Sequence, residues 1–122
     1  MKILRVLDFV VRADGSTFTA NFKGQTHEFV LKLKGKVNIQ NTLAALCVGL
    51  SQGISLRIAN KALKNLSHIP GRFEFIEEGQ NFKVMVDYAP EPESMRQLYE
   101  FLEIYKKEHG IKRIIHVTGS AG

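Results

Sequence analysis

The stretch Gly35–Gly53, GKVNIQNTLAALCVGLSQG, marks the point where the hydrophobic pattern of the chain changes. Its large apolar side chains recur at intervals of three or four residues, which is the repeat of one face of an α-helix. They are Ile39, Leu43, Leu46 and Leu50. Glycine is the residue type that most often ends a helix in the left-handed conformation. We therefore predict a helix over this stretch that ends just before Gly53.

The residues before this helix predict three strands. Apolar and β-branched residues dominate 3–12, 17–22 and 26–33, whereas turn-forming residues occupy 13–16 and 23–25. Short turns between consecutive strands are typical of an antiparallel meander. This part of the chain is therefore predicted to be α+β, with a β-meander followed by helices.

A second helix and a boundary are predicted after the first helix. Ser55 is a typical N-cap residue, and apolar residues at helical spacing continue to about Leu66. Ile69-Pro70-Gly71 then interrupts the pattern, because proline and glycine break both helices and strands. We predict a domain boundary here, with residues 1–69 in one unit and residues 70–122 in the next.

The second unit has the order of elements of an α/β fold. Strands are predicted at 73–76 and 82–86, followed by a helix that starts near Pro92 and stops at Gly110. Residues 113–117 form a continuous apolar run, which is typical of a strand buried on both faces of a parallel sheet. A β-β-α-β order that leads into a Gly-rich loop opens a Rossmann-like domain. The predicted fold class is therefore α/β, with α+β in the N-terminal part.

Composition places the chain among ordinary globular proteins. Of its 122 residues 44% are hydrophobic and 24% are charged, which is enough for a core and excludes disorder throughout. No apolar run approaches the roughly 20 residues of a membrane span, and no signal peptide follows Met1. The single cysteine, Cys47, excludes an internal disulfide and a zinc cluster, and is expected to pack as a small apolar side chain. A reducing, cytoplasmic setting is the default expectation.

The net charge of +5 comes from 17 Lys and Arg residues against 12 Asp and Glu residues. The basic residues are scattered along the chain. Lys32, Lys34 and Lys36 alternate with Leu31 and Leu33, as on the solvent face of a half-buried strand. Because no aromatic residues lie between them, they do not form the stripe typical of nucleic-acid binders. We expect neither a nucleic-acid nor a membrane partner.

Four polar residues are candidates for binding a ligand. Asp87 follows a predicted strand, where a carboxylate can accept hydrogen bonds from ribose hydroxyls or, equally, from the backbone of its own turn. Asn38 and Asn41 lie one turn apart at the start of a helix, where their amides suit the edge of an adenine, although capping is the commoner use. Arg72 follows a Pro-Gly turn, and its guanidinium suits a phosphate or an interdomain carboxylate. The alternative is an ordinary surface arginine.

Other signals are weaker. Backbone N–H groups of residues 118–122 could cradle an anion. The chain nevertheless contains no G-x-x-x-x-G-K-[ST] phosphate loop. The histidines have no metal-ligand spacing, so each is expected to be an ordinary surface or loop residue, and we expect no metal site. They are His27, His68, His109 and His116.

Three segments, in this order, resemble the Mur ligase family, and in particular its UDP-N-acetylmuramoyl-tripeptide synthetases. They are GKVNIQNTLAA at 35–45, PGRFE at 70–74, and VDYA at 86–89 with Pro92 and Ser94. The family has a Gly-x-Phe-Asn-x-x-Asn helix start, a Gly-Arg-Met/Phe-Glu turn and an Asp-Tyr-Ala-His-Thr-Pro-Asp-Ser stretch. The superfamily also holds the folylpolyglutamate synthases. On this resemblance, residues 1–69 are the C-terminal part of the central ATPase domain and residues 70–122 the N-terminal part of the C-terminal domain.

The resemblance implies an ATP-dependent amide ligase of peptidoglycan precursor synthesis. Such enzymes phosphorylate a substrate carboxylate, and the amine of an amino acid then attacks the acyl phosphate. The implied partners are ATP, with Mg²⁺ in the complete enzyme, a UDP-muramoyl-peptide and an amino acid. By the same resemblance Asn38 and Asn41 face the adenine, Arg72 the phosphates and Asp87 the ribose, while Tyr88 lies against the nucleotide. Glu74 also matches the family pattern, and we interpret it as structural.

The sequence departs from the family pattern in two ways. Pro90 stands where the family has His, and Glu91 stands where it has Thr. The phosphate loop and the metal-binding and carbamylated-lysine residues of the family are absent from the sequence, so we expect the chain to contribute the adenine and ribose side of an ATP site, with no catalytic residue, and to be inactive alone. The alternative is a non-catalytic nucleotide-binding module, or one that self-associates through exposed sheet edges. A nucleic-acid binder ranks last.

Overall fold

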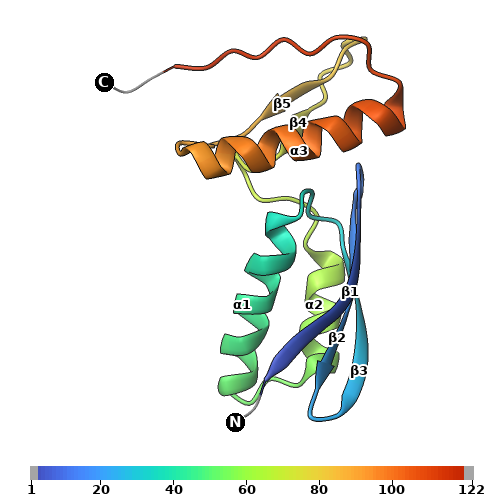
Figure 1. Cartoon of the computed structure of the whole chain (residues 1–122), viewed down its shortest axis with the longest axis vertical. Coiled ribbons are helices and arrows are strands. Elements are labelled where there is room, and N and C mark those ends of the chain that lie inside the picture. Colours follow the sequence, from blue (N-terminus) through green and yellow to red (C-terminus); the bar gives the residue numbers. More distant parts are fainter. Residues whose placement is uncertain (1–2, 120–122) are drawn as a thin grey trace.

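The computed structural model describes residues 3–119. A three-stranded sheet carries two helices on one face, and a third helix with a small two-stranded sheet lies beyond one end of it (Figure 1). The elements in chain order are β1 (Leu4–Arg12), β2 (Gly15–Phe22), β3 (Gln25–Leu31), α1 (Val37–Ser51), α2 (Leu56–Asn65), β4 (Glu74–Ile76), β5 (Val84–Val86) and α3 (Pro92–His109). The mixture of strands and helices confirms the predicted α/β class.

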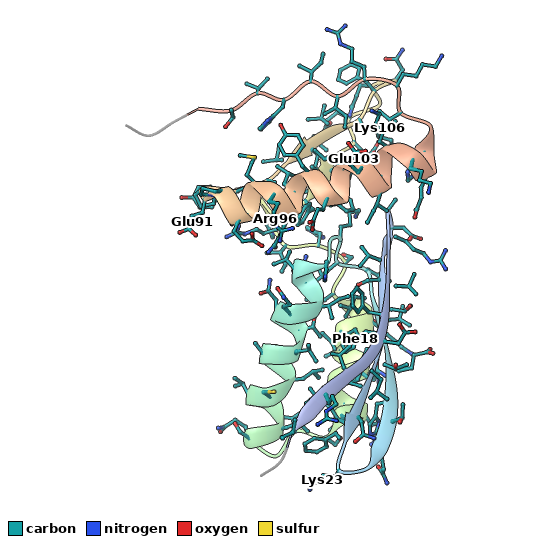
Figure 2. All side chains as sticks on the ribbon, viewed as in Figure 1. Phe18, Lys23, Glu91, Arg96, Glu103 and Lys106 are labelled. Carbon is teal, nitrogen blue, oxygen red and sulfur yellow. The ribbon has the colours of Figure 1, made fainter. Side chains whose placement is uncertain are left out.

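The predicted meander is confirmed: β1, β2 and β3 are antiparallel neighbours in that order. Alternate side chains point to the helices, so that Phe18 of β2 and Phe29 of β3 are buried opposite each other. Their rings stack with centroids 4.8 Å apart. Figure 2 shows Phe18 between the sheet and the helices. The pair anchors the first hydrophobic cluster, which α1 and α2 complete with Ile39, Leu46 and Leu56.

The turn between β1 and β2 is tighter than predicted, because Gly15 and Ser16 already belong to β2. Gly15 has a φ of +150°, and a Cβ atom there would lie only 2.1 Å from the carbonyl oxygen of Leu31. Any side chain would therefore force β3 away from β2. The absence of a side chain at Gly15 lets the start of β2 pair with the end of β3.

Both helices of this unit begin and end as predicted. Gly53 follows α1 with a φ of +82°, and the hydroxyl oxygen of Ser55 accepts a hydrogen bond from the Ile58 N–H at 3.4 Å at the start of α2. Cys47 is a correction: it is exposed on α1. The buried Leu46 faces the sheet, and the next residue along a helix is turned about 100° away from that face.

A second hydrophobic cluster joins α3 to the β4–β5 hairpin. Phe73, Leu98 and Phe101 are its buried residues, and the rings of Phe73 and Phe101 meet edge to face with centroids 4.9 Å apart. Pro92 begins α3, and Gly110 ends it in the left-handed conformation with a φ of 63°, both as predicted. The two strands predicted before α3 are present in shortened form.

The strand predicted at 113–117 is not formed. Residues 111–119 are without regular secondary structure, and the side chains of Ile115 and Val117 are 74% and 89% exposed. A parallel strand needs a neighbour to bond with, whereas β4 and β5 pair with each other in an antiparallel ladder of three residues each. The sheets of the described chain are therefore both antiparallel. Residues 120–122 of the predicted Gly-rich loop lie outside the described residues.

The two clusters meet where β1 approaches α3. The backbone N–H of Ala13, at the end of β1, donates to the carboxylate of Glu108 at 2.9 Å. Val37 at the start of α1 packs against the second cluster. The predicted boundary between residues 69 and 70 stays a prediction. Among the described residues, no helix combines the length and the apolar character needed to cross a bilayer.

The N-terminal half of α3 carries a cluster of ion pairs around Arg96. Arg96 donates to Glu93 through both Nε, at 2.8 Å, and Nη2, at 2.5 Å, and also contacts Glu100. Together with a hydrogen bond from Gln97, the Arg96 bonds lower the pKa of Glu93 from its ordinary 4.5 to about 2. Because this pKa is lowered, any stabilisation from the pair is present above pH 4.5 and is lost as the pH falls toward 2.

Substitution of Gly15 is expected to destabilise the fold. Gly15→Ala places a methyl group against the Leu31 carbonyl, so the free energy of unfolding should fall by about 2 kcal/mol or more. Gly49→Ala is the matched control. A Cβ atom added at Gly49 in α1 would lie 3.8 Å from the Ile54 side chain, an ordinary contact, so the free energy of unfolding should rise slightly through helix propensity. Urea unfolding of the two variants measures the difference. Equal stabilities would contradict the close approach of β2 and β3.

Removal of the arginine should release the pKa of Glu93. In Arg96→Ala the pKa should rise from about 2 toward 4.5, incompletely, because the hydrogen bond from Gln97 remains. Carboxyl NMR shifts of Glu93 against pH measure this change. Lys83→Ala, which removes an ion pair with Glu77 instead, should leave the pKa of Glu93 unaltered. A Glu93 pKa that stays near 2 in Arg96→Ala would disprove the assigned cause.

Candidate functional site

Three of the five predicted site residues come together where the turn at 69–73 meets the end of β5. The backbone N–H of Tyr88 donates to the Gly71 carbonyl at 2.9 Å, and Nη1 of Arg72 donates to the Tyr88 carbonyl at 2.6 Å. The guanidinium of Arg72 lies over the Tyr88 ring, 5.5 Å from its centroid. The Tyr88 side chain is 66% exposed. An aromatic ring and a stacked cation are therefore presented on one surface.

Asp87 fixes the backbone of this turn. Its Oδ2 accepts a hydrogen bond from the Phe73 N–H at 2.9 Å, and Phe73 has an unusual φ of +45°. Left-handed backbone at a bulky residue persists only where the surroundings hold it. The structure thus shows the backbone-bonding use of Asp87 that the sequence left open. Within residues 3–119 its second oxygen, Oδ1, accepts no hydrogen bond, and the side chain is half-buried.

Glu74 completes the turn from the other side. Its Oε2 accepts a hydrogen bond from the Gly71 N–H at 2.7 Å, and the Arg72 N–H donates to the Ile69 carbonyl at 3.0 Å. Two carboxylates therefore hold the backbone on either side of Arg72. This arrangement supports the structural interpretation of Glu74 and fixes the backbone position from which the Arg72 side chain extends.

Asn38 and Asn41 form a separate pair in the first turn of α1. Asn38 is 5% exposed, and its Nδ2 donates to the Lys34 carbonyl at 2.7 Å while its Oδ1 accepts from Nδ2 of Asn41 at 3.3 Å. Neither side chain therefore caps the helix, because neither accepts a bond from a free backbone N–H. Asn38 holds the preceding loop, and Asn41 is the exposed member of the pair.

Phe73 is the link between the two groups. Its ring lies so close to Gly35 that a Cβ atom there would be 3.1 Å from ring carbons. Gly35 lies just before α1, so the Asn38 end of the helix and the Arg72 turn approach each other across this contact. The structure brings Arg72, Asp87 and Tyr88 into one cluster and Asn38 and Asn41 into another, with Phe73 between them.

Two hollows of the described surface lie away from these residues. One, of about 210 Å³, lies between β1 and α3 and is lined by residues that include Phe9, Lys36 and Phe101. The other is a shallow depression beside the C-terminal end of α3. None of the five predicted residues lines either of them. The Arg72 cluster therefore lies outside both hollows.

Metal-ligating side chains do not gather in the part of the chain that the structure describes. Among residues 3–119 no three His, Cys, Asp or Glu side chains are placed to hold one ion. His116 contacts Tyr99 through a 2.7 Å hydrogen bond instead. Mg²⁺, which the resemblance implies for a complete enzyme, has no fitting ligand set here.

Comparison with curated proteins gives strong matches along most of the chain. The sequence is 36% identical over 100 residues to the UDP-N-acetylmuramoyl-L-alanyl-D-glutamate--2,6-diaminopimelate ligase of Bacillus cereus, covering 82% of this chain and 20% of that protein. It is 44% identical over 78 residues to the enzyme of the same name from Geobacillus thermodenitrificans, covering 64% of this chain and 16% of that protein. No family model matches the sequence.

Solved structures agree. The fold matches MurF of Acinetobacter baumannii with a TM-score of 0.73 and 25% identity over 82% of this chain and 22% of that one. It matches the UDP-N-acetylmuramate-alanine ligase MurC of Thermotoga maritima with a TM-score of 0.73 and 22% identity, over 85% of this chain and 25% of that one, which shows the fold alone.

This chain belongs to the Mur ligase family and corresponds to a segment of its members. It spans about a fifth of the length of the curated ligases that it matches. The recognition that rested on three short segments is therefore confirmed.

Within this Mur ligase segment, sequence reasoning missed two residues whose contacts join distant parts of the chain, one at the site and one away from it. Phe73 joins the Arg72 turn to α1, and its only sequence signal was the Pro-Gly-Arg-Phe order, in which we singled out the arginine. Glu108 bonds to a backbone N–H that lies 95 positions away. No local pattern could have indicated that contact.

Asp87 is expected to be a stability residue as well as a site residue. Asp87→Ala leaves the half-buried Phe73 N–H without its acceptor, so the free energy of unfolding should fall by about 1–3 kcal/mol. Asp87→Asn retains an oxygen acceptor and should lose less. Glu103→Ala on the exposed side of α3 is the control. Urea unfolding that ranked Asp87→Ala with this control would contradict the role of the carboxylate in the turn.

Proposed function

We propose that this Mur ligase segment supplies the adenine and ribose side of the ATP site of an ATP-dependent amide ligase in peptidoglycan precursor synthesis. The observation that carries the proposal is the cluster of Arg72, Asp87 and Tyr88 at the end of β5. Exposed rings beside a cation are suited to stacking against a nucleobase or sugar. The ligase names of the relatives support the reaction class.

Three of the proposed site residues, drawn from both groups, have hydrogen-bonding groups available to a nucleotide. Arg72 uses Nη1 on the Tyr88 carbonyl, which leaves its other N–H groups for a phosphate. Asp87 uses Oδ2 on Phe73, so Oδ1 is available to a ribose hydroxyl. Asn41 presents an amide, which carries both a donor and an acceptor, to the adenine edge, and Asn38 positions it.

The segment is proposed to bind nucleotide weakly and to be inactive alone. Its sequence contains no phosphate loop, and the Arg72 cluster lies outside both hollows described above. The acyl phosphate chemistry, with its Mg²⁺, UDP-muramoyl-peptide and amino acid, therefore requires residues beyond these 122. We assign the complete enzyme to the cytoplasm, where its nucleotide substrates are made.

ATP titration tests the nucleotide site. ATP should raise the melting temperature of the chain, and Tyr88→Ala should abolish the rise because the stacking surface is lost. Phe82→Ala is the matched control, since Phe82 is an equally exposed aromatic side chain, 62% exposed, outside the cluster. No response to ATP in the unmodified chain at millimolar concentration would disprove the proposal.

A comparison of ligands separates the roles within the site. Arg72→Ala should weaken binding of ATP but not of adenosine, because only the phosphates contact the guanidinium. Adenosine binding should instead depend on Asp87 and Tyr88. NMR shift titrations with both ligands measure the two affinities. Equal losses for ATP and adenosine in Arg72→Ala would contradict the assignment of the arginine to phosphate.

Inactivity of the isolated segment is checked by phosphate release. The purified 122-residue chain with ATP, UDP-muramoyl-peptide and amino acid should release no more phosphate than buffer. Any release that depends on both ATP and the amino acid would show that the chain is a catalyst by itself.

A further inference from the structure

The face of the β1–β2–β3 sheet opposite α1 and α2 carries no helix of the described chain (Figure 1). The ladder register aligns its outward side chains in rows across the strands. Val10 of β1 and Val30 of β3 share one row because both are opposite Thr17 of β2. They are 43% and 39% exposed. This row is therefore an apolar strip on a solvent-facing sheet surface.

Charged rows flank the apolar row on both sides. Asp8 and Glu28 share the row on one side, since both are opposite Thr19. On the other side Arg12 is opposite Gly15, and a Cβ atom built on Gly15 would lie 3.3 Å from the Cα atom of Lys32, so Arg12 and Lys32 share a row. All four charged residues are exposed. The order along both outer strands is acidic, apolar, basic.

This order is self-complementary under one two-fold rotation. Rows are spaced two residues apart, roughly 7 Å, on each side of the apolar row. In this arrangement the two-fold axis lies parallel to the sheet, perpendicular to the strands, at the apolar row. The strands of the second copy then run in the opposite direction. Arg12 then faces Asp8 of the second copy, and Lys32 faces Glu28 of the second copy, with valines between. An axis along the strands would place like charges together, so the charges select one arrangement.

We propose that this outer sheet face is a docking surface for a second copy of the chain, packed face to face in that arrangement. Opposed sheets pack about 10 Å apart with their strands roughly aligned, which suits valines that fill the gap between two charged rows. Three strands offer much less area than the roughly 800 Å² per partner of a stable interface. The dimer is therefore weak and forms at high concentration.

The same strands argue against pairing through the edge. β1 and β3 are the two edge strands: the ladder of β1 is interrupted by a bulge between Val6 and Asp8, and on β3 the Glu28 carbonyl already accepts a hydrogen bond from Nδ2 of Asn60 in α2 at 2.8 Å. Bulges twist an edge and disrupt regular pairing with another strand. The face rather than the edge offers the regular, charge-matched surface.

Sedimentation equilibrium with charge-exchange variants tests the dimer. The unmodified chain should show a mass that rises above the monomer value between about 20 μM and 1 mM, as a small interface requires. Asp8→Arg and Arg12→Asp each place like charges opposite one another in the dimer, and each should weaken association roughly tenfold. An equimolar mixture of the two variants should associate again, because positions 8 and 12 are both basic in one variant and both acidic in the other.

Further variants keep the test independent of folding defects. Lys32→Glu repeats the experiment just after the end of β3, where it opposes Glu28 of the second copy. Arg57→Asp, the same type of charge change on exposed α2, should leave association unaltered, and circular dichroism verifies that every variant is folded. The proposal is overturned by an unmodified chain that stays monomeric to 1 mM. It is also overturned by association that persists in Asp8→Arg and Lys32→Glu, or by a mixture that fails to associate.

Discussion

The contacts of Phe73 are the constraint on which the rest of the structure depends. Its N–H is held by Asp87, its ring meets Phe101 in the second cluster, and the same ring covers Gly35 ahead of α1. One residue in a left-handed conformation therefore connects the β5 end, α3 and the first unit. The turn that carries Arg72 has its shape because Phe73 is held in this way. Both the fold and the candidate site rely on that single backbone geometry.

Sequence patterns predicted those elements whose signals are local. The meander follows from apolar and β-branched runs between turn residues. The helices of the first unit and the limits of α3 follow from helical spacing, a Ser N-cap, Pro at a helix start and Gly at helix ends. The prediction of a strand at 113–117 was wrong because an apolar run indicates burial but does not indicate which strand would pair with it. The expected packing of Cys47 was wrong because Cys47 lies outside the apolar stripe of α1, turned by about 100° from the buried Leu46.

The site was predictable in part for the same reason. Arg72, Asp87 and Tyr88 belong to a turn and a strand end whose types are legible in sequence, and the structure brings them together. The inward bond from Asn38 to Lys34 was not predictable, because an amide at a helix start has several partners within reach. Family resemblance supplied roles for these residues, whereas the structure shows which of their atoms remain available.

The bond between Ala13 and Glu108 has a consequence for the order of folding. Most contacts of the first unit join neighbours in sequence, such as hairpin strands, and can form early, whereas this bond must close a loop of 95 residues. Docking of α3 onto β1 is therefore a late event, after the meander exists. The amide hydrogen of Ala13, buried at 1% exposure, gains its protection from exchange only at that last step.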